Sequence, residues 1–474
     1  MSALMPADTR AALGLDAEKC DSRSLFMDRF ARPEAKDDST STPRRDWFNK
    51  LISKNPCIQS NRTWLPESSK VPQLYAQLQS RLMVNMAGGV MENAGLCLDR
   101  FGLPYLPVSA VKGSARRLAL AALHEWMDTG AKPSGEDNLF TPACRPFSTP
   151  ADMLAEIALV FGWGEADWDA RNRTKEGRFK SDLVFAVGEH RWPVIIHQVG
   201  QLLLGEEPKA ARDFGYFAGS VGFLPAYPIK VGAQNLPLPE PELGKLELDV
   251  VTCHHGDYYG GKMDVATDTE PPVPVVFPAV AAGHIFTFAL LPLRNCPPNR
   301  LGGARTWLTT SLTTFGLGAK TAAGYGWFDV SEDLQSSVRG ALKAAQDRRL
   351  KEQSDRKEDA RLKAEEKKAQ ERRETIKAAM ANLTPEQQED FKLTQLTDDQ
   401  FRSALDNYTR RPAEEQKAIV RALRLEPGVP NSRRPFWDDL KAKAQKKGGK
   451  YAQTEQTIRQ ISKQLFPGKE GKMP

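Results

Sequence analysis

The sequence has few of the residue patterns that build disulfide frameworks or metal clusters. Only six cysteines occur among its 474 residues, and none belongs to a C-x-x-C pair. This spacing gives no support for a zinc ribbon or a thioredoxin-like motif. We therefore expect free thiols in a reducing cytoplasm, with no metal site and no cofactor.

Long apolar runs are also missing. No stretch approaches the roughly 20 uninterrupted apolar residues of a membrane-spanning helix, so no membrane partner is expected. The first 20 residues contain scattered Asp, Arg and Glu and lack the apolar core of a signal peptide. The net charge of +6, from 66 basic and 60 acidic residues, neither demands nor excludes nucleic acid.

Glycine and proline are unevenly distributed, and this divides the chain. Both are frequent from about residue 88 to residue 326, whereas no glycine lies between Gly340 and Pro427. A body of strands and loops followed by a helical tail is the simplest interpretation. We predict a partly ordered N-terminal lead-in, an α+β domain, a charged helical linker and a basic helical domain, at residues 1–75, 76–330, 331–382 and 383–474.

The predicted body alternates strands and helices. Two short aromatic pieces of the lead-in, at residues 25–27 and 47–48, are expected to anchor it to this body. Strands are predicted at residues 78–84, 183–187, 194–196, 246–253, 275–277, 284–291 and 325–330. Helices are predicted at residues 109–129, 153–161 and 307–315. This order is typical of an α+β fold, and a ferredoxin-like (RRM-type) split βαβ sheet with large insertions fits it.

The tail is predicted to be helical throughout. Residues 331–381 are densely charged, which favours a long helix that is either simply solvated or follows RNA with its basic residues. Thr384 and Thr397 are expected helix caps, each with Gln three residues later. Further helices are predicted from residue 411 and over residues 454–465, and basic clusters precede the last helix.

The most distinctive segment is glycine-rich and spans residues 316–328, GLGAKTAAGYGWF. Its glycines permit positive φ angles and close backbone approach, and its amides could face an anion. Lys320 adds a positive charge, and Tyr325 offers a ring on which a base could stack. The order of helix, loop and strand fits neither a P-loop nor a dinucleotide fingerprint, so no nucleotide cofactor is predicted.

A second segment, residues 103–117, reads LPYLPVSAVKGSARR. A proline-framed stretch leads into a helix for which Ser109 is the expected N-cap. Helix N-termini bind phosphate through their free amides. Lys112 and Arg116 lie at i,i+4 on one face, and Arg117 follows. We expect this segment and the glycine-rich segment to fold together into a positively charged cradle for a ribose-phosphate backbone.

Together the two segments resemble the RAMP superfamily of CRISPR effector proteins. The family's G-φ-G-x5-G-x-G loop is matched by residues Gly316, Leu317, Gly318, Gly324 and Gly326. The fuller strings, with residues 249–259 and 271–275, resemble the sixth-subunit family of the type III-B (Cmr) module. The resemblance covers about residues 78–330, and it departs from the family at Val108, where a glycine is usual.

The resemblance implies an RRM-like fold that binds the crRNA backbone and caps one end of a filament of related subunits. It implies that another subunit cleaves the target, so no catalytic residue is expected. The implied partners are crRNA, target RNA, other Cmr-type RAMP subunits and the small helical subunit. The implied RNA contacts are Lys112, Ser114, Arg116, Gly318, Lys320, Thr321 and Tyr325. We expect four neighbouring residues of the same two segments to bind RNA as well: Arg117, Gly316, Gly324 and Gly326.

A histidine pair stands in the segment HHGDY. His254 and His255, with Tyr258, could contact RNA or another subunit, form a structural turn, or act as a metal or acid–base site. Adjacent strand residues point to opposite faces, which disfavours a shared metal ion. His197 and His284 lie in apolar stretches and are expected in the core.

We interpret the chain as a non-catalytic, crRNA-binding subunit of a type III-B effector complex. One alternative is a metal-independent crRNA-processing endoribonuclease that uses His254 or His255. A second is a scaffold whose tail docks another subunit and touches little RNA. The tail could itself be a fused bundle that resembles the small helical subunit.

Overall fold

The computed structural model divides into two compact units, Met1–Asp347 and Arg348–Pro474. Each unit is considered by itself. The structure describes residues 8, 11, 20–30, 42–57, 71–85, 96–164, 167, 174, 175, 177, 181–205, 215–253, 255–267, 273–447 and 449–468. The finer division of residues 1–75, 76–330, 331–382 and 383–474 stays a prediction.

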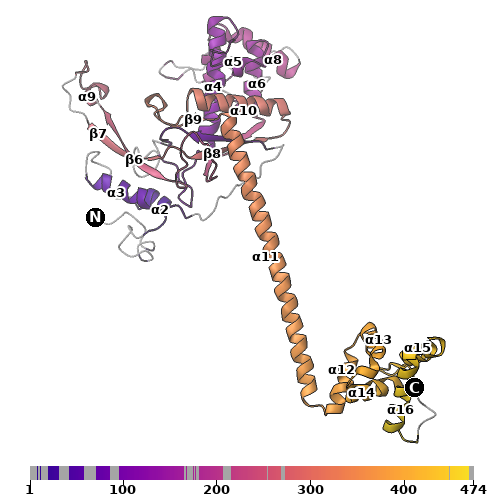
Figure 1. The fold of residues 1–474 in the computed structure, drawn as a ribbon. Helices are drawn as coiled ribbons and strands as arrows, with labels where there is room; N and C mark the ends of the chain where they lie inside the picture. Colours follow the sequence, from indigo (N-terminus) through magenta and orange to yellow (C-terminus); the bar gives the residue numbers. More distant parts are fainter. Residues whose placement is uncertain are drawn as a thin grey trace. The chain divides into compact units, whose positions relative to one another are not determined.

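An antiparallel sheet forms the centre of the first unit (Figure 1). Its strands are β1 (Gln73–Leu78), β4 (Val221–Phe223), β5 (Tyr227–Ile229), β8 (Ile285–Pro292) and β9 (Phe328–Asp329). Their order is β4-β8-β1-β9, and β5 also pairs with β8. The sheet is therefore built from strands that are distant in the sequence.

The first predicted strand is displaced along the chain. We expected it at residues 78–84, whereas β1 ends at Leu78. Beyond this residue the backbone leaves the sheet: Leu82 bridges Val280, and the carbonyl of Met83 accepts from the amide of Ala319. These partners satisfy the backbone of an apolar run that sequence alone cannot distinguish from a strand.

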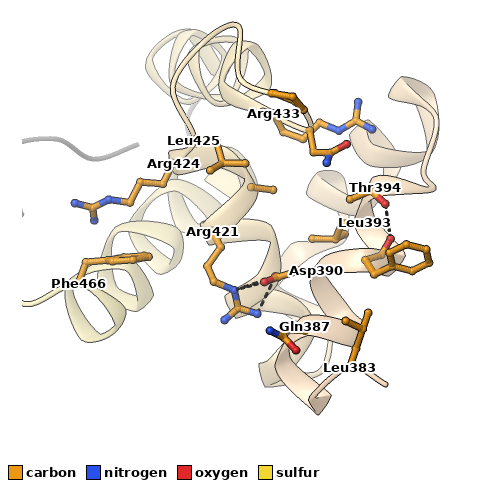
Figure 2. Close-up of a pocket in the computed structure, with 14 residues that line it drawn as sticks. Leu383, Gln387, Asp390, Leu393, Thr394, Arg421, Arg424, Leu425, Arg433 and Phe466 are labelled. Carbon is orange, nitrogen blue, oxygen red and sulfur yellow. Dashed lines mark hydrogen bonds and ion pairs between the residues drawn. The ribbon is translucent and has the colours of Figure 1, made fainter. Parts of the chain in front are cut away.

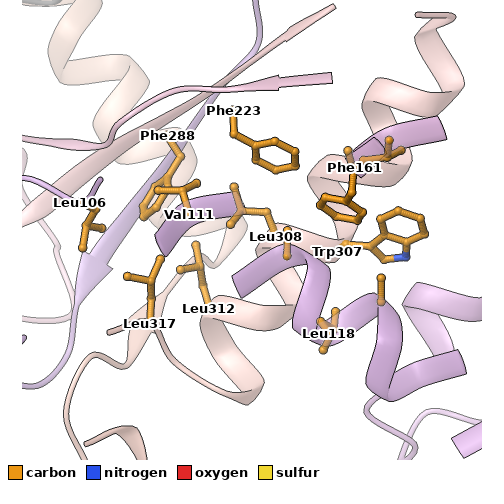
Figure 3. Close-up of a cluster of buried hydrophobic side chains, with 14 of the residues drawn as sticks. Leu106, Val111, Leu118, Phe161, Phe223, Phe288, Trp307, Leu308, Leu312 and Leu317 are labelled. Carbon is orange, nitrogen blue, oxygen red and sulfur yellow. The ribbon is translucent and has the colours of Figure 1, made fainter. Parts of the chain in front are cut away.

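Six helices pack together beside this sheet. They are α4 (Val108–Thr129), α5 (Thr141–Cys144), α6 (Pro150–Phe161), α7 (Asp182–Val187), α8 (Trp192–Leu204) and α10 (Pro298–Thr314). Two of them, α4 and α10, pack directly on the strands of the sheet. Figure 3 shows side chains of α4, α6 and α10 packing with Phe223 and Phe288 of the sheet. The same buried cluster includes Leu317, which follows α10. A minor pair, β2 (Gly162–Trp163) and β3 (Phe217–Ala218), flanks α6.

The predicted strands at residues 183–187 and 194–196 are wrong, because both stretches are helical. The hydroxyl of Ser181 accepts from the amide of Leu183, 3.2 Å away, and so caps α7. Pro193 lies in the first turn of α8, and Gly205 ends it at φ +70°. Burial at helical spacing (Trp192, Ile195, Val199) outweighs the strand preference of β-branched residues.

A long hairpin and the lead-in complete the first unit. The predicted strands here are confirmed as β6 (Leu246–Cys253) and β7 (Val273–Val280), with α9 (Gly256–Tyr259) at the tip. The lead-in contributes α2 (Arg23–Asp28) and α3 (Thr42–Ser53). Phe26 and Trp47 are buried and stack at 3.9 Å between ring centroids. The expected aromatic anchors of the lead-in are confirmed.

The predicted charged helix is a single helix of 50 residues, α11 (Glu332–Ala381). Its first turns pack Leu334 and Val338 against Tyr75 of β1 and its neighbours. Gln335 also pairs with the backbone of Tyr75, because its amide oxygen accepts from the Tyr75 amide and its amide nitrogen donates to the carbonyl. Beyond these turns almost every side chain is exposed, as expected for a solvated helix.

The second unit contains a bundle with its own core. Its helices are α12 (Pro385–Thr394), α13 (Asp398–Asp406), α14 (Ala413–Arg424), α15 (Arg434–Lys447) and α16 (Gly449–Leu465). Thr384 and Thr397 both form capping boxes, as predicted. Sequence reasoning missed α15, whose buried Trp437 and Leu440 join the core. The basic clusters predicted before the last helix therefore lie largely on a helix of their own.

Candidate nucleic-acid interface

The structure brings the two distinctive segments together. A cavity of about 380 Å³ lies between the first turns of α4 and the glycine-rich loop. It is lined by Val84, Asn85, Ser109, Ala110, Gly113, Ser114, Arg117, Gly316, Leu317, Gly318 and Ala319. The described lining residues include one cation and no carboxylate, so the cavity suits an anionic ligand.

Three glycines of the loop are required by close backbone contacts. A Cβ on Gly318 would lie 2.3 Å from the Met83 carbonyl oxygen, and one on Gly326 would lie 2.0 Å from that of Leu317. Gly316 is similarly restricted, at 2.8 Å from the Gly326 carbonyl oxygen. Gly324 differs, because its φ of +92° favours glycine although a Cβ there would meet open space. Most glycines of the loop are therefore required because a side chain at their positions would clash with backbone atoms.

Backbone hydrogen bonds hold the loop in one conformation. The amide of Leu317 donates to the carbonyl of Gly326, and the amide of Gly326 donates to that of Arg81, both at 2.8 Å. Leu317 itself is buried in the core of the first unit. Lys320 and Thr321 lie at the outer bend, where the Lys320 side chain is exposed. The loop is therefore pre-organised before any ligand binds.

The α4 helix begins without a side-chain cap. Its N-cap is Pro107, and no side chain accepts from the first amides. The prediction of Ser109 as N-cap is wrong, because Val108 is already helical and Ser109 lies in the first turn. The φ of proline, near −65°, suits the residue before a helix. The uncapped first turn, with Ser109 and Ala110, lines the cavity and presents the positive end of the helix dipole.

The cations predicted on α4 separate into two groups. Arg117 lines the cavity, whereas Arg116 pairs with Asp182 of α7, with 3.0 Å between Nε and Oδ2. Lys112 is half-buried, and burial, followed by the charge of Arg116, lowers the pKa of its ammonium group. Arg117 is therefore the α4 cation that the geometry directs to the cavity.

Ser114 lies at the contact between α4 and α10. Its hydroxyl is 2.7 Å from that of Ser311, which donates in turn to the Ser114 carbonyl. This pair connects the two helices beside the cavity. Its role as an RNA contact stays a prediction.

Tyr325 lies on the other side of the loop, against the β6–β7 hairpin. Its hydroxyl donates to Asp249, 2.6 Å away, and its ring packs near that of Phe277. Arg81 bridges Asp249 and Glu247 at 3.0 and 2.9 Å. Burial, followed by the bond to Asp249, raises the pKa of Tyr325 to about 12. Burial alone would raise the pKa of Asp249, but the bonds from Tyr325, Val250 and Arg81 outweigh it and lower that pKa.

Tyr325→Phe is expected to lower the stability of the first unit and to leave RNA affinity close to wild type. The variant removes one of the hydrogen bonds that Asp249 accepts, while those from Arg81 and Val250 stay. This loss costs about 1 kcal/mol of unfolding free energy in the first unit. A carboxylate with a lowered pKa stabilises the fold above its unfolded pKa and loses that contribution as the pH falls. The difference from wild type should therefore narrow as the pH falls from 6 to 3, as followed by urea unfolding.

Tyr259, which is 81% exposed, provides the control, because Tyr259→Phe should change neither the stability nor the RNA affinity. A strong loss of RNA affinity in Tyr325→Phe, with unchanged stability, would instead assign the hydroxyl to the ligand.

His255 and Tyr258 lie at the tip of the hairpin and do not line the cavity. His254 lies outside the described residues. His255 has a φ of +64°, and its Nδ1 lies 3.1 Å from the carbonyl oxygen of Thr267. Tyr258 is partly exposed and packs edge-on against Tyr259. Four residues of extended strand, about 13 Å, separate Asp249 from the end of β6, so the tip and the cavity are distinct places.

The two other histidines considered differ from each other. His284 is buried, accepts from the Gly244 amide at 3.0 Å, and lies 2.7 Å from the Ala281 carbonyl oxygen. Burial lowers its pKa to about 4, which confirms the prediction of a satisfied core residue. The prediction for His197 is wrong, because it is exposed on α8. Among the described residues no group of three His, Cys, Asp or Glu could hold a metal ion.

A larger cavity, of about 600 Å³, lies in the second unit (Figure 2). Apolar residues such as Leu393, Leu425 and Phe466 line much of it. Arg421 extends to Asp390, with 2.9 Å between Nε and Oδ1. Arg424 and Arg433 also line the cavity, which therefore combines apolar side chains with arginines. Sequence reasoning did not predict it.

Two residues at the first cavity also escaped sequence reasoning. Asn85 lines the cavity with a φ of +66°. Phe315 lies beside Arg117, whose Cζ is 4.7 Å from the ring centroid. The position of Phe315 directly before the first glycine of the motif was the available signal.

Comparison with known proteins identifies relatives over the body of the chain. The model of the RAMP superfamily matches residues 87–329. CRISPR system Cmr subunit Cmr6 from Pyrococcus furiosus is 27% identical over 260 residues, which are 52% of this chain. The alignment spans 64% of the length of that relative.

Two solved structures are also similar. The crystal structure of Cmr6 from Pyrococcus furiosus matches with a TM-score of 0.26 and 22% identity, over 56% of this chain and 100% of that one. A chain of the type III-B Cmr-beta complex bound to cognate target RNA matches with a TM-score of 0.29 and 14% identity, over 69% of this chain and 73% of that one.

Within the ranges that the structure describes, no helix combines the length and the apolar character needed to cross a bilayer.

Proposed function

Because the chain belongs to the RAMP superfamily, we propose that it is an RNA-binding subunit of a type III-B CRISPR (Cmr) effector complex. The observation that carries this proposal is the cavity between α4 and the glycine-rich loop. An uncapped helix start, a stacked arginine and a rigid loop converge there. Such an arrangement suits the phosphates of a nucleic-acid backbone.

We also propose that the sheet is of the RRM type. The elements follow the order β1-α4-β4-β8-α10-β9, and the strands of the sheet are all antiparallel. This order is that of the split βαβ arrangement. The β6–β7 hairpin and the helices between α4 and β4 are then insertions into this arrangement, and the lead-in is an addition before it.

The face of the sheet that RRM domains commonly use is covered in this protein. Along β1, Leu74 and Ala76 face the core that contains α4 and α10, whereas Tyr75 faces the start of α11. RRM domains stack bases on aromatic residues of the exposed face. Since α11 packs on that face, RNA is expected at the cavity beside the sheet.

Backbone contacts should dominate the binding. A guide RNA differs in sequence from one complex to the next, and phosphate contacts carry no sequence information. The described lining of the cavity also has no imidazole or carboxylate that could serve as an acid–base pair. A non-catalytic role in holding crRNA, alongside other RAMP subunits and a small helical subunit that together engage target RNA, follows from this proposal. For the second unit we propose two alternative roles, a fused bundle that resembles the small helical subunit or a module that docks another subunit.

Purification of the tagged full-length protein from its host tests the proposal. We expect a co-purifying RNA with a uniform 5′ sequence, and no cleavage of repeat RNA by the protein in EDTA. Cleavage that His254→Ala or His255→Ala abolishes would instead support a metal-independent ribonuclease. Absence of RNA from a fold-competent, complex-bound preparation would contradict RNA binding.

A further inference from the structure

Phe315 occupies a junction between the helical core and the cavity. It is the C-cap of α10 and directly precedes Gly316. The ring of Phe140 packs at a tilt against the ring of Phe315, with 6.3 Å between the centroids. On another side, the Cζ of Arg117 lies 4.7 Å from the ring centroid. The ring thus connects the anchored end of the loop with the cation that lines the cavity.

The chemistry of this stack leaves the arginine available to a ligand. A cation–π contact uses the flat face of the guanidinium group, whereas its five N–H donors point outward in the plane. In the described part of the chain, Arg117 has neither an ion pair nor a hydrogen bond through its side chain. Its donors are therefore not committed to a protein acceptor.

Arg116 shows the alternative arrangement on the same helix. Its guanidinium group donates to both carboxylate oxygens of Asp182. This pair neutralises the charge and occupies the fork that would otherwise bind phosphate. Adjacent arginines are thus held in opposite ways, one by an acid and one by an aromatic ring.

We infer that Phe315 is a positioning residue that holds the Arg117 guanidinium group toward the cavity, ready to bind a backbone phosphate of single-stranded RNA. This inference rests on the proposed function. An unstacked arginine samples many rotamers and loses that freedom on binding. Stacking restricts the rotamers beforehand, so less entropy is lost when the phosphate binds.

Substitutions of Phe315 separate the stacking contact from simple packing. Phe315→Leu keeps an apolar side chain against Phe140 but removes the aromatic face, whereas Phe315→Tyr retains the face. With labelled oligouridylate RNA and the full-length protein, Phe315→Leu should weaken binding about fivefold. Phe315→Tyr should bind as tightly as wild type. Unfolding curves of each variant show whether the fold is kept.

A double-mutant cycle assigns the effect to Arg117. In an Arg117→Ala background, Phe315→Leu should cause no further loss of affinity. The matched control is Phe101→Leu, because Arg100 stacks on Phe101 at 4.6 Å but does not line the cavity. This control should bind RNA as wild type does.

Two kinds of failure can be told apart. If wild type does not bind RNA, the proposed function and this role of Phe315 are both overturned. If wild type binds RNA but Phe315→Leu weakens it equally with and without Arg117, or Phe315→Tyr weakens it as Leu does, only the positioning role is overturned.

Discussion

Gly326→Ala is expected to destabilise the first unit by about 3 kcal/mol and to abolish RNA binding at the cavity. Its φ is +69°, and the added Cβ would lie 2.0 Å from the carbonyl oxygen of Leu317. The clash is with backbone, which cannot rotate away. Relief requires opening the hydrogen bond between Leu317 and Gly326, and the loop then loses its position against α4.

Gly324→Ala provides the matched control within the same loop. Its φ of +92° is also unfavourable for alanine, but the added Cβ would meet no atom within 4 Å. We expect a loss of only about 1 kcal/mol and RNA affinity close to wild type. Thermal unfolding and filter binding measure both quantities. Equal effects of the two substitutions would show that the close contact does not determine the loop.

Removal of Arg117 together with Lys112 and Lys320, two predicted RNA contacts that do not line the cavity, should have the second large effect. In the variant Lys112→Ala, Arg117→Ala and Lys320→Ala, RNA affinity should fall roughly 100-fold at physiological salt. Each lost phosphate contact on single-stranded RNA lowers the slope of log K against log salt by about 0.7, so the slope should fall by about 2. None of the three forms an ion pair with a described carboxylate, so folding should be little affected.

A variant with the same charge change in the second unit tests the location of the effect. Lys446, Lys450 and Lys463 are exposed on α15 and α16, and their replacement by alanine also removes three positive charges. Affinity and salt slope should stay near wild type. An equal or larger loss in this variant would move the main RNA contact to the helical bundle.

The approach of the α4 segment to the glycine-rich loop could be predicted from the sequence, whereas several elements around them could not. The spacing of the glycines indicates positions where a side chain would not fit. At Gly316, Gly318 and Gly326 an added Cβ would indeed clash with a backbone carbonyl oxygen. The apolar residue between the first two glycines, Leu317, reports the anchor in the core. Local rules of this kind can be recognised without knowledge of the fold.

Tertiary partners explain what the sequence did not predict. The strand prediction at residues 183–187 was wrong because the Ser181 cap and the burial of α7 against its neighbours stabilise a helix there. The sequence could not show that Arg116 and Arg117 have different partners, because Asp182, which pairs with Arg116, is distant in the sequence. Tyr325 was predicted to stack on a base, although its hydroxyl and ring contact Asp249 and Phe277; stacking stays a prediction.

Photo-crosslinking of 4-thiouridine-labelled RNA to the full-length protein, with mass-spectrometric mapping, tests most directly whether α4 and the glycine-rich loop together hold the RNA backbone. Adducts are expected in both residues 108–117 and residues 315–326 when a single labelled nucleotide is used. Adducts confined to the hairpin tip at residues 255–263 or to the helical bundle, with none at the cavity, would contradict this.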